Sequence, residues 1–214
     1  MTSESTETTR LLEQASLGDP AAIETILMRH RQRLRRMVVA RLDQRLSKRI
    51  DPSDVIQEAY LEASVRLPAY LREPKMPFFL WLRFLTAQKI ITLHRKHIGV
   101  QMRGAGQEVA LACGMFPQAS SAAIAADLLD QGTRPSEAAV RAERNERLRQ
   151  ALDQLPPLDR EALALRHFEQ LSRSEIAIVL GVTEAAAGKR YLRALEKLKQ
   201  LLDPFEGDRE GLFP

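Results

Sequence analysis

The sequence contains very little cysteine and no long apolar segment. Cys113 is the single cysteine among 214 residues, which excludes an intramolecular disulfide framework and a cysteine-based zinc site. A lone thiol also fits a reducing compartment. The N-terminus, MTSESTETTR, lacks the apolar core of a signal peptide, and apolar runs such as Phe78 to Leu82 are far too short to span a bilayer. We therefore expect a cytoplasmic protein that does not insert into a membrane.

Aromatic residues are also scarce. They make up only 5% of the chain, while hydrophobic residues as a whole make up 44%, so Leu, Ile, Val and Ala have to build any core. That composition suits helices packed on helices better than a sheet, and no segment shows convincing strand periodicity. We predict an all-α fold of two small helical domains joined by a linker, with a helix-turn-helix in the C-terminal domain. A net charge of +4 and a pI near 9.4 indicate an anionic partner.

The first predicted domain covers residues 10–98. Asp19-Pro20 and Asp51-Pro52 are typical helix starts, with Asp as the N-cap and Pro in the first turn. Apolar residues follow each start at helical spacing. Leu67-Pro68 predicts a break after the second helix, and a third helix is predicted from Phe78 to His97.

The segment after this domain changes in character. Residues 99–134 are rich in Gly, Ala and Ser with few charges, so we predict a linker, with a weak helix signal near 122–129. A C-terminal helical domain is predicted over 135–203. The two ends of the chain, 1–9 and 204–214, are predicted to be tails, the first of them disordered.

Near the C-terminus the sequence predicts two helices joined by a tight turn. Ser172 and Glu175 form a capping box at the start of the first helix. Gly181 supplies the left-handed conformation of the turn, and Thr183 caps a second, longer helix. This is the helix-turn-helix arrangement. The outer face of the second helix is basic, carrying Lys189, Arg190, Arg193, Lys197 and Lys199.

A basic helix of this kind fits the major groove, where Arg and Lys donate to guanine edges and to phosphates. The competing interpretation is a structural hairpin with a solvated basic face. Gly188 adds a second open question, because a mid-helix glycine costs about 1 kcal/mol relative to alanine. Either the helix backbone approaches DNA closely there, or glycine is simply tolerated on an exposed face.

Several segments resemble one family. Residues 171–198, LSRSEIAIVLGVTEAAAGKRYLRALEKL, resemble the C-terminal promoter-binding domain of RNA polymerase sigma factors of the extracytoplasmic-function class, and LDQLPPLDREALALRHFEQ at 152–170 is similar to its lead-in. SDVIQEAYLEA at 53–63 resembles the acidic core-binding helix of that family. FFLWLRFLTAQKIITLHRKH at 78–97 resembles the helix that follows. Departures such as Ala186 to Gly188 in the second helix leave the promoter sequence open.

The resemblance implies three sets of binding residues. It implies a site for core polymerase at Asp51, Asp54, Gln57 and Glu58. It implies contacts with the melted −10 element, for which the candidate residues are Arg72, Lys75, Lys89, His94, Arg95 and Lys96. It implies contacts with the −35 element as duplex, for which they are Ser172, Arg173, Thr183, Glu184, Gly188, Lys189, Arg190 and Arg193.

Other interpretations of these residues stay open. The carboxylates of Asp51, Asp54 and Glu58 could line a solvated helix face, or form a metal or acid pair, although no histidine or fourth ligand lies nearby. The arginine-rich run from Arg29 to Arg49 is either a solvated face, a contact with the DNA backbone, or a partner for acidic helices. Trp81 could be a stacking platform for bases, but its register with the apolar face favours the core.

We therefore predict a non-enzymatic sigma factor, with no catalytic residue, metal or cofactor. Its predicted partners are core RNA polymerase and promoter DNA, with an anti-sigma factor as a candidate third. The first alternative is a stand-alone helix-turn-helix regulator, which would bind palindromic DNA tightly without the polymerase. The second is a helical adaptor that binds only protein.

Overall fold

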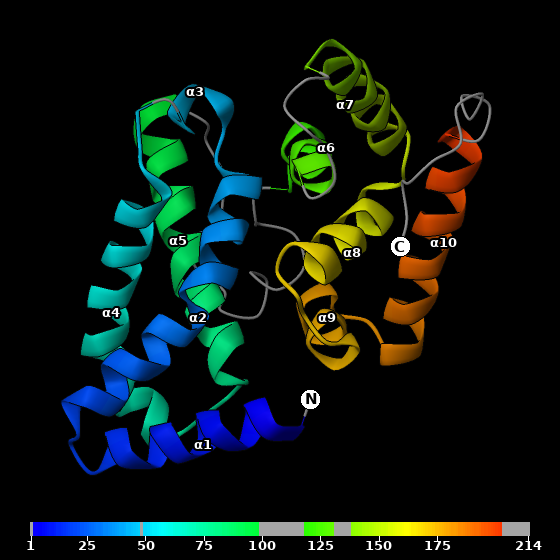
Figure 1. The fold of residues 1–214 in the computed structure, drawn as a ribbon. Coiled ribbons are helices and arrows are strands. Elements are labelled where there is room, and N and C mark those ends of the chain that lie inside the picture. Colours follow the sequence, from blue (N-terminus) through cyan, green and yellow to red (C-terminus); the bar gives the residue numbers. More distant parts are fainter. Residues whose placement is uncertain (1, 48, 99–117, 131–137, 203–214) are drawn as a thin grey trace. The chain divides into compact units, whose positions relative to one another are not determined.

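The structure, a computed structural model, describes residues 2–47, 49–98, 118–130 and 138–202 (Figure 1). Within these ranges all regular structure is α-helical, in ten helices, and no strand occurs. The all-α prediction is therefore confirmed. Helices α1 to α5 belong to one unit and α6 to α10 to a second. None of the described helices is both long enough and apolar enough to cross a bilayer.

The N-terminal unit is built on three long helices that pack on one another (Figure 1). They are α2 (Pro20–Arg41), α4 (Pro52–Arg72) and α5 (Phe78–Ile98), with the shorter α1 (Thr2–Ser16) and α3 (Gln44–Ser47) beside them. Both predicted Asp-Pro starts are confirmed. The carboxylate of Asp19 accepts from the Ala21 N–H at 2.9 Å, and that of Asp51 accepts from the Ser53 N–H at 2.7 Å.

Aliphatic side chains from these helices form the core of this unit. Its largest fully buried members are Ile26, Leu34, Met37, Ile56, Leu82, Leu85 and Ile90. Burying each such side chain contributes roughly 1.5–3 kcal/mol. The helical spacing of apolar residues in the sequence therefore corresponds to the faces that are buried.

The predicted break at Leu67-Pro68 is wrong, because α4 continues through Pro68 to Arg72. A proline inside a helix costs about 3 kcal/mol, since it has no N–H to donate and its ring crowds the preceding turn. Leu67 and Tyr70 are both buried on either side of it, and their burial offsets that cost. The Tyr70 hydroxyl also donates to the Met76 carbonyl at 2.9 Å, which fastens the following loop to the helix.

At the N-terminus, α1 begins at Thr2, inside the segment that we expected to be disordered. Leu11 and Ala15 of this helix are buried, and α1 packs on α2. A helix gains most of its stability from packing an apolar face. The contacts of Leu11 and Ala15 therefore stabilise α1, including its polar N-terminal half.

The second unit contains α6 (Ser121–Asp130), α7 (Ala138–Asp153), α8 (Pro157–His167), α9 (Arg173–Leu180) and α10 (Glu184–Leu202). Helix α6 lies inside the range predicted to be a linker, yet it packs on α7. Arg160 of α8 donates to the Ser121 hydroxyl at 3.3 Å and to the Gln118 side chain at 3.0 Å. The rest of the predicted linker, 99–117 and 131–134, and the predicted tail at 204–214 lie outside the described residues.

Candidate functional site

The helix-turn-helix is present as predicted. At the start of α9, the Ser172 hydroxyl accepts from the Glu175 N–H at 3.2 Å, and the Glu175 carboxylate accepts from the Ser172 N–H at 2.7 Å. Gly181 ends the helix with a φ of 63°, in the left-handed region that favours glycine. The Thr183 hydroxyl then accepts from the Ala186 N–H at 3.2 Å, at the start of α10.

Helix α10 is strongly two-sided. It buries Ala187, Ala194 and Leu198 and packs on both α8 and α9. Tyr191, Leu195 and Leu202 of this helix are half-buried. Of the predicted basic outer face, Lys189, Arg193, Lys197 and Lys199 are exposed, and so is Glu184 at the start of the helix.

Arg190 differs from the other outer-face cations. Its guanidinium Nη1 lies 3.1 Å from Oδ1 of Asp159, a residue of the first turn of α8 that is 1% exposed. The Arg193 Nη1 lies 3.9 Å from the other carboxylate oxygen. A buried carboxylate is tolerated when it is paired and hydrogen-bonded in this way. Asp159 was missed in the sequence, because its pairing with Arg190 joins residues 31 positions apart.

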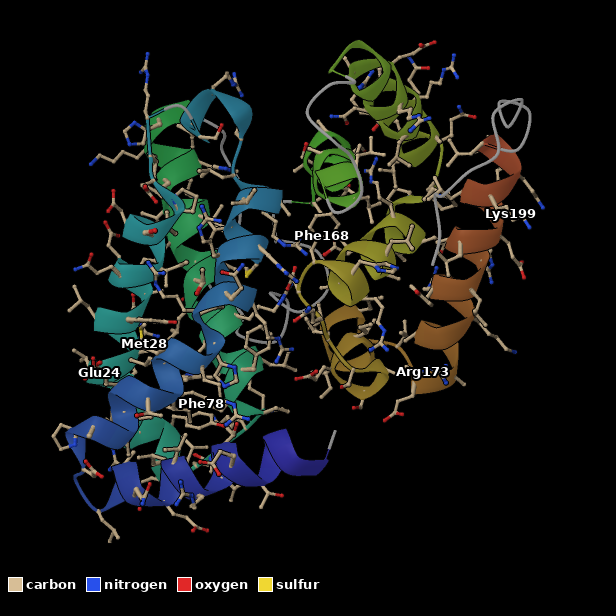
Figure 2. All side chains as sticks on the ribbon, viewed as in Figure 1. Glu24, Met28, Phe78, Phe168, Arg173 and Lys199 are labelled. Atoms are coloured by element: carbon tan, nitrogen blue, oxygen red, sulfur yellow. The ribbon has the colours of Figure 1, made fainter. Side chains whose placement is uncertain are left out.

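Arg173 and Gly188 lie together. A Cβ placed on Gly188 would meet only the Arg173 side chain, at 4.0 Å, which is ordinary van der Waals contact. Figure 2 labels Arg173 beside the first half of α10 and Lys199 near its end. Nothing in the described part of the chain therefore requires glycine at position 188.

We expect Gly188→Ala to stabilise α10 by about 1 kcal/mol, because alanine is the better helix former and meets no close contact. If the glycine allows DNA to approach the helix, the same variant loses about fivefold in affinity for duplex DNA. Hydrogen exchange of the α10 amides measures the stability, and fluorescence anisotropy measures the affinity. Tighter or unchanged DNA binding would show that glycine is merely tolerated there.

The four predicted core-binding residues, Asp51, Asp54, Gln57 and Glu58, are all exposed, and three of them lie on the first two turns of α4. Asp51 precedes these as the N-cap of the helix. Hydrogen bonds from the backbone N–H and the hydroxyl of Ser53 lower the pKa of its carboxyl. Asp51 is thus already engaged within the chain, which leaves the other three as the more available polar groups.

Two apolar residues extend this surface. Leu61 and Val65 are 66% and 80% exposed. They follow Asp54 and Glu58 at positions that repeat every three or four residues, so they lie on the same face of α4. We call Asp54, Glu58, Leu61 and Val65 the α4 stripe. An acidic stripe with an apolar end is typical of a surface for a protein partner, because a stable interface needs an apolar centre. The sequence pattern did not reveal these two residues.

The structure does not bring the six candidate −10 residues together. Arg72 and Lys75 are exposed near the α4–α5 connection, whereas Arg95 and Lys96 are exposed at the far end of α5. At 1.5 Å of rise per residue these two groups lie about 25 Å apart along the helix. A single strand would have to run along α5 to meet both.

Lys89 and His94 of that set contact other elements of the unit. Lys89 Nζ lies 2.5 Å from Oε2 of Glu62 on α4. The Nε2 of His94 accepts from the Asp43 N–H at 3.3 Å, and burial lowers the pKa of its ring. Both residues tie neighbouring elements of the unit together, whereas Arg72 donates to the Pro68 carbonyl of its own helix at 3.3 Å and stays exposed.

Trp81 lies in an aromatic cluster next to the same connection. Its ring stacks on Tyr70, with centroids 4.6 Å apart, and approaches Phe78 at 5.6 Å. The indole is half-buried. Its packing against two aromatic side chains agrees with the core role favoured from the sequence register.

The arginine-rich run divides among several environments. Arg41 is buried, Arg33 lies over the Phe79 ring at 3.6 Å from its centroid, and Arg31 donates to the Ser53 hydroxyl at 3.4 Å. Arg29 and Arg35 are exposed. Among the described residues, no group of His, Cys, Asp and Glu side chains could hold a metal ion.

Known proteins resemble this chain in sequence and in fold. The family described as Sigma-70, region 4 matches residues 145–198, which run from within α7 into α10. The ECF RNA polymerase sigma factor SigD of Mycobacterium tuberculosis is 30% identical over 189 residues, covering 88% of this chain and 81% of SigD. The RNA polymerase sigma-H factor of Pseudomonas aeruginosa is 25% identical over 196 residues, covering 91% of this chain and 93% of that protein.

Among solved structures, CnrH, determined in complex with the cytosolic domain of CnrY, has a similar fold. The TM-score is 0.52 at 23% identity, over 92% of this chain and 98% of CnrH. Two helical units, a capped helix-turn-helix and relatives that match along most of the chain all agree with the resemblance seen in the sequence. The chain belongs to the extracytoplasmic-function (ECF) class of RNA polymerase sigma factors.

Proposed function

We propose that this sigma factor binds core RNA polymerase through its N-terminal unit and directs initiation at promoters with specific −10 and −35 elements. The observation that carries the proposal is the separation of two exposed surfaces of opposite character. The α4 stripe is acidic and apolar, whereas the outer face of α10 is basic, and each lies in its own unit. The first suits a protein partner and the second suits DNA.

The C-terminal unit would hold the −35 element as duplex. Glu184 and Lys189 are exposed in the first half of α10, the part of a recognition helix that reaches base edges. The hydroxyls of Ser172 and Thr183 cap the N-termini of α9 and α10. The remaining backbone N–H groups of these two N-termini are suited to bind phosphates. Arg173 and Arg193 supply further exposed cations.

The N-terminal unit would engage the polymerase and the melted −10 strand. Asp54, Gln57 and Glu58 would meet cationic groups of the polymerase, with Leu61 and Val65 packing at the centre of the contact. For the −10 strand, Arg72, Lys75, Arg95 and Lys96 are favoured over Lys89 and His94, because the side chains of the first four are exposed and those of the other two are half-buried. Single-stranded DNA is held by such charges together with stacking surfaces.

This function would place the protein in the cytoplasm with the chromosome, and it requires no catalytic chemistry of its own. The two units would bind DNA weakly when alone and strongly when the polymerase holds both, because attachment raises the effective concentration of the second contact. We keep an anti-sigma factor as a candidate further partner. CnrH, which is similar in fold, was solved with the cytosolic domain of CnrY.

A stand-alone helix-turn-helix regulator is not favoured. The similarity to SigD extends over 88% of the chain and so includes the N-terminal unit, for which a regulator that merely shares the helix-turn-helix has no need. An adaptor that binds only protein would leave the exposed basic face of α10 without a role.

Transcription in vitro tests the function directly. Purified core polymerase from the host bacterium is mixed with the chain and a library of promoter fragments, and the transcript starts are sequenced. We expect initiation at a subset of fragments that share two spaced elements, and no such initiation from core polymerase alone. Lack of promoter-specific starts across the library would contradict the proposal, and tight binding to palindromic DNA without polymerase would favour the regulator.

A further inference from the structure

Asp159 lies in the first turn of α8, at the contact between α8 and α10. Its side chain is 1% exposed, and its two carboxylate oxygens face two different arginines of α10. Arg190 approaches Oδ1 at 3.1 Å with hydrogen-bonding geometry, and Arg193 approaches Oδ2 at 3.9 Å. Because residues three apart lie on the same face of a helix, one carboxylate can face both.

The two arginines differ in exposure. The Arg190 side chain is 28% exposed, whereas that of Arg193 is 63% exposed. Arg190 is therefore the inner link between the helices, and Arg193 is the guanidinium that an incoming phosphate or base can reach. Asp159 lies close enough to orient Arg193, but the longer separation leaves its outer N–H groups free to donate.

The α8 end of this contact is well suited to a buried carboxylate. The first turn of a helix carries a positive dipole, which stabilises a negative charge there. Two guanidinium groups also exceed the single carboxylate in charge, so the cluster stays cationic. An arginine that is already oriented loses less side-chain entropy when it binds DNA.

We propose that Asp159, held in place by Arg190, is a positioning residue for DNA recognition, which acts by orienting Arg193 toward the duplex. The inference rests on the proposed −35 binding function and deepens it. It predicts that Asp159 contributes to the preference for a particular sequence, more than to general affinity for DNA, because an oriented guanidinium discriminates between base edges while any cation attracts phosphates.

The test compares two DNA probes with the full-length chain. The first is the duplex that the wild-type chain, bound to core polymerase, selects from a randomised double-stranded library, and the second is poly(dI-dC). We expect Asp159→Asn to lower affinity for the selected duplex by about tenfold, since groups in contact couple strongly, and affinity for poly(dI-dC) by less than about twofold. Glu143→Gln, which removes a carboxylate from an exposed pair with Arg147 in the same unit, should change neither.

A double-mutant cycle identifies the route of the effect. In a chain that already carries Arg193→Ala, Asp159→Asn should cost almost nothing further on the selected duplex, because the arginine through which it acts is gone. An undiminished tenfold loss in that background, or equal losses on both probes, would overturn the positioning role and leave only a structural one.

Circular dichroism checks that each variant folds. If Asp159→Asn loses its helical signal, Asp159→Glu takes its place, since it keeps the charge and only moves the carboxylate. We then expect a loss of about threefold on the selected duplex alone, and no loss would overturn the inference. A wild-type chain that selects no duplex even when bound to core polymerase would instead contradict the −35 binding function, and this inference with it.

Discussion

Replacing both Asp54 and Gln57 with alanine lowers the affinity of the chain for core polymerase by roughly 100-fold, which is about 3 kcal/mol. Both side chains are exposed on the first turns of α4, so their removal leaves the core of the unit intact. Truncating a charged group in a polymerase contact costs this much because its partner is left buried and unpaired. Fluorescence anisotropy with labelled protein and purified core polymerase measures the change.

Three further variants separate this interpretation from general damage. Glu13→Ala removes an exposed carboxylate from α1 and should leave core binding unchanged. Val65→Ser, at the apolar end of the α4 stripe, should weaken core binding by about tenfold without destabilising the unit, because Val65 is exposed. Lys189→Ala on α10 should weaken the binding of duplex DNA and leave core binding unchanged. If the Asp54 and Gln57 double variant reduced duplex binding to the same extent, the two units would not have separate roles.

The second large effect concerns acid stability and His30 of α2. This ring is 3% exposed and lies between Phe78 and Phe79, with ring centroids 5.9 and 5.3 Å away. Within the described part of the chain, neither ring nitrogen has a hydrogen-bond partner. Burial, with the nearby charges of Arg33 and Arg29, lowers the pKa of His30 from 6.5 to about 4.

The direction of the pH effect follows from the lowered pKa. Between pH 6.5 and about 4 the unfolded chain holds a proton on His30 that the folded chain does not, so acid favours unfolding. Stability is full above pH 6.5 and falls as the pH drops toward 4. A difference of about 2.5 pKa units corresponds to a loss of roughly 3 kcal/mol over that range.

Trp81 allows this loss to be measured in the N-terminal unit by itself, because it is the single tryptophan of the chain and stacks on Tyr70 there. Urea denaturation followed by its fluorescence is repeated from pH 7.5 to 4.5. We expect His30→Leu, which is similar in volume but does not ionise, to remove most of the drop. His97→Leu, at an exposed position of α5, should behave as wild type. A His30→Leu profile as steep as that of the wild type would contradict the role of His30.

Features that depend on neighbours in the sequence were predicted well. Asp19, Asp51, Ser172 and Thr183 each cap a helix where the sequence placed a cap. Capping joins groups two or three residues apart, so the residue types alone identify it. The left-handed turn at Gly181 is similarly local. These signals establish the helix-turn-helix before any packing is known.

Features that depend on packing were not predicted. The sequence placed a break at Pro68, but the burial of Leu67 and Tyr70 carries α4 through it. It placed Arg190 among the −35 candidates but gave no sign that a buried carboxylate from another helix holds that side chain. It gave only a weak helix signal for residues 122–129 within a linker, although they form most of α6, which packs on α7.

The sequence by itself determined that this protein is helical, where most of its helices begin, that it ends in a helix-turn-helix, and which family it resembles. Each of these follows from periodicity, caps and motifs, whose physical causes act within a few residues. Only the tertiary structure decided which charges are free to bind. The pairing of Asp159 with Arg190 and the burial of His30 arise when helices distant in the sequence pack together, and burial then sets whether a charge is paired, neutral or available to a partner.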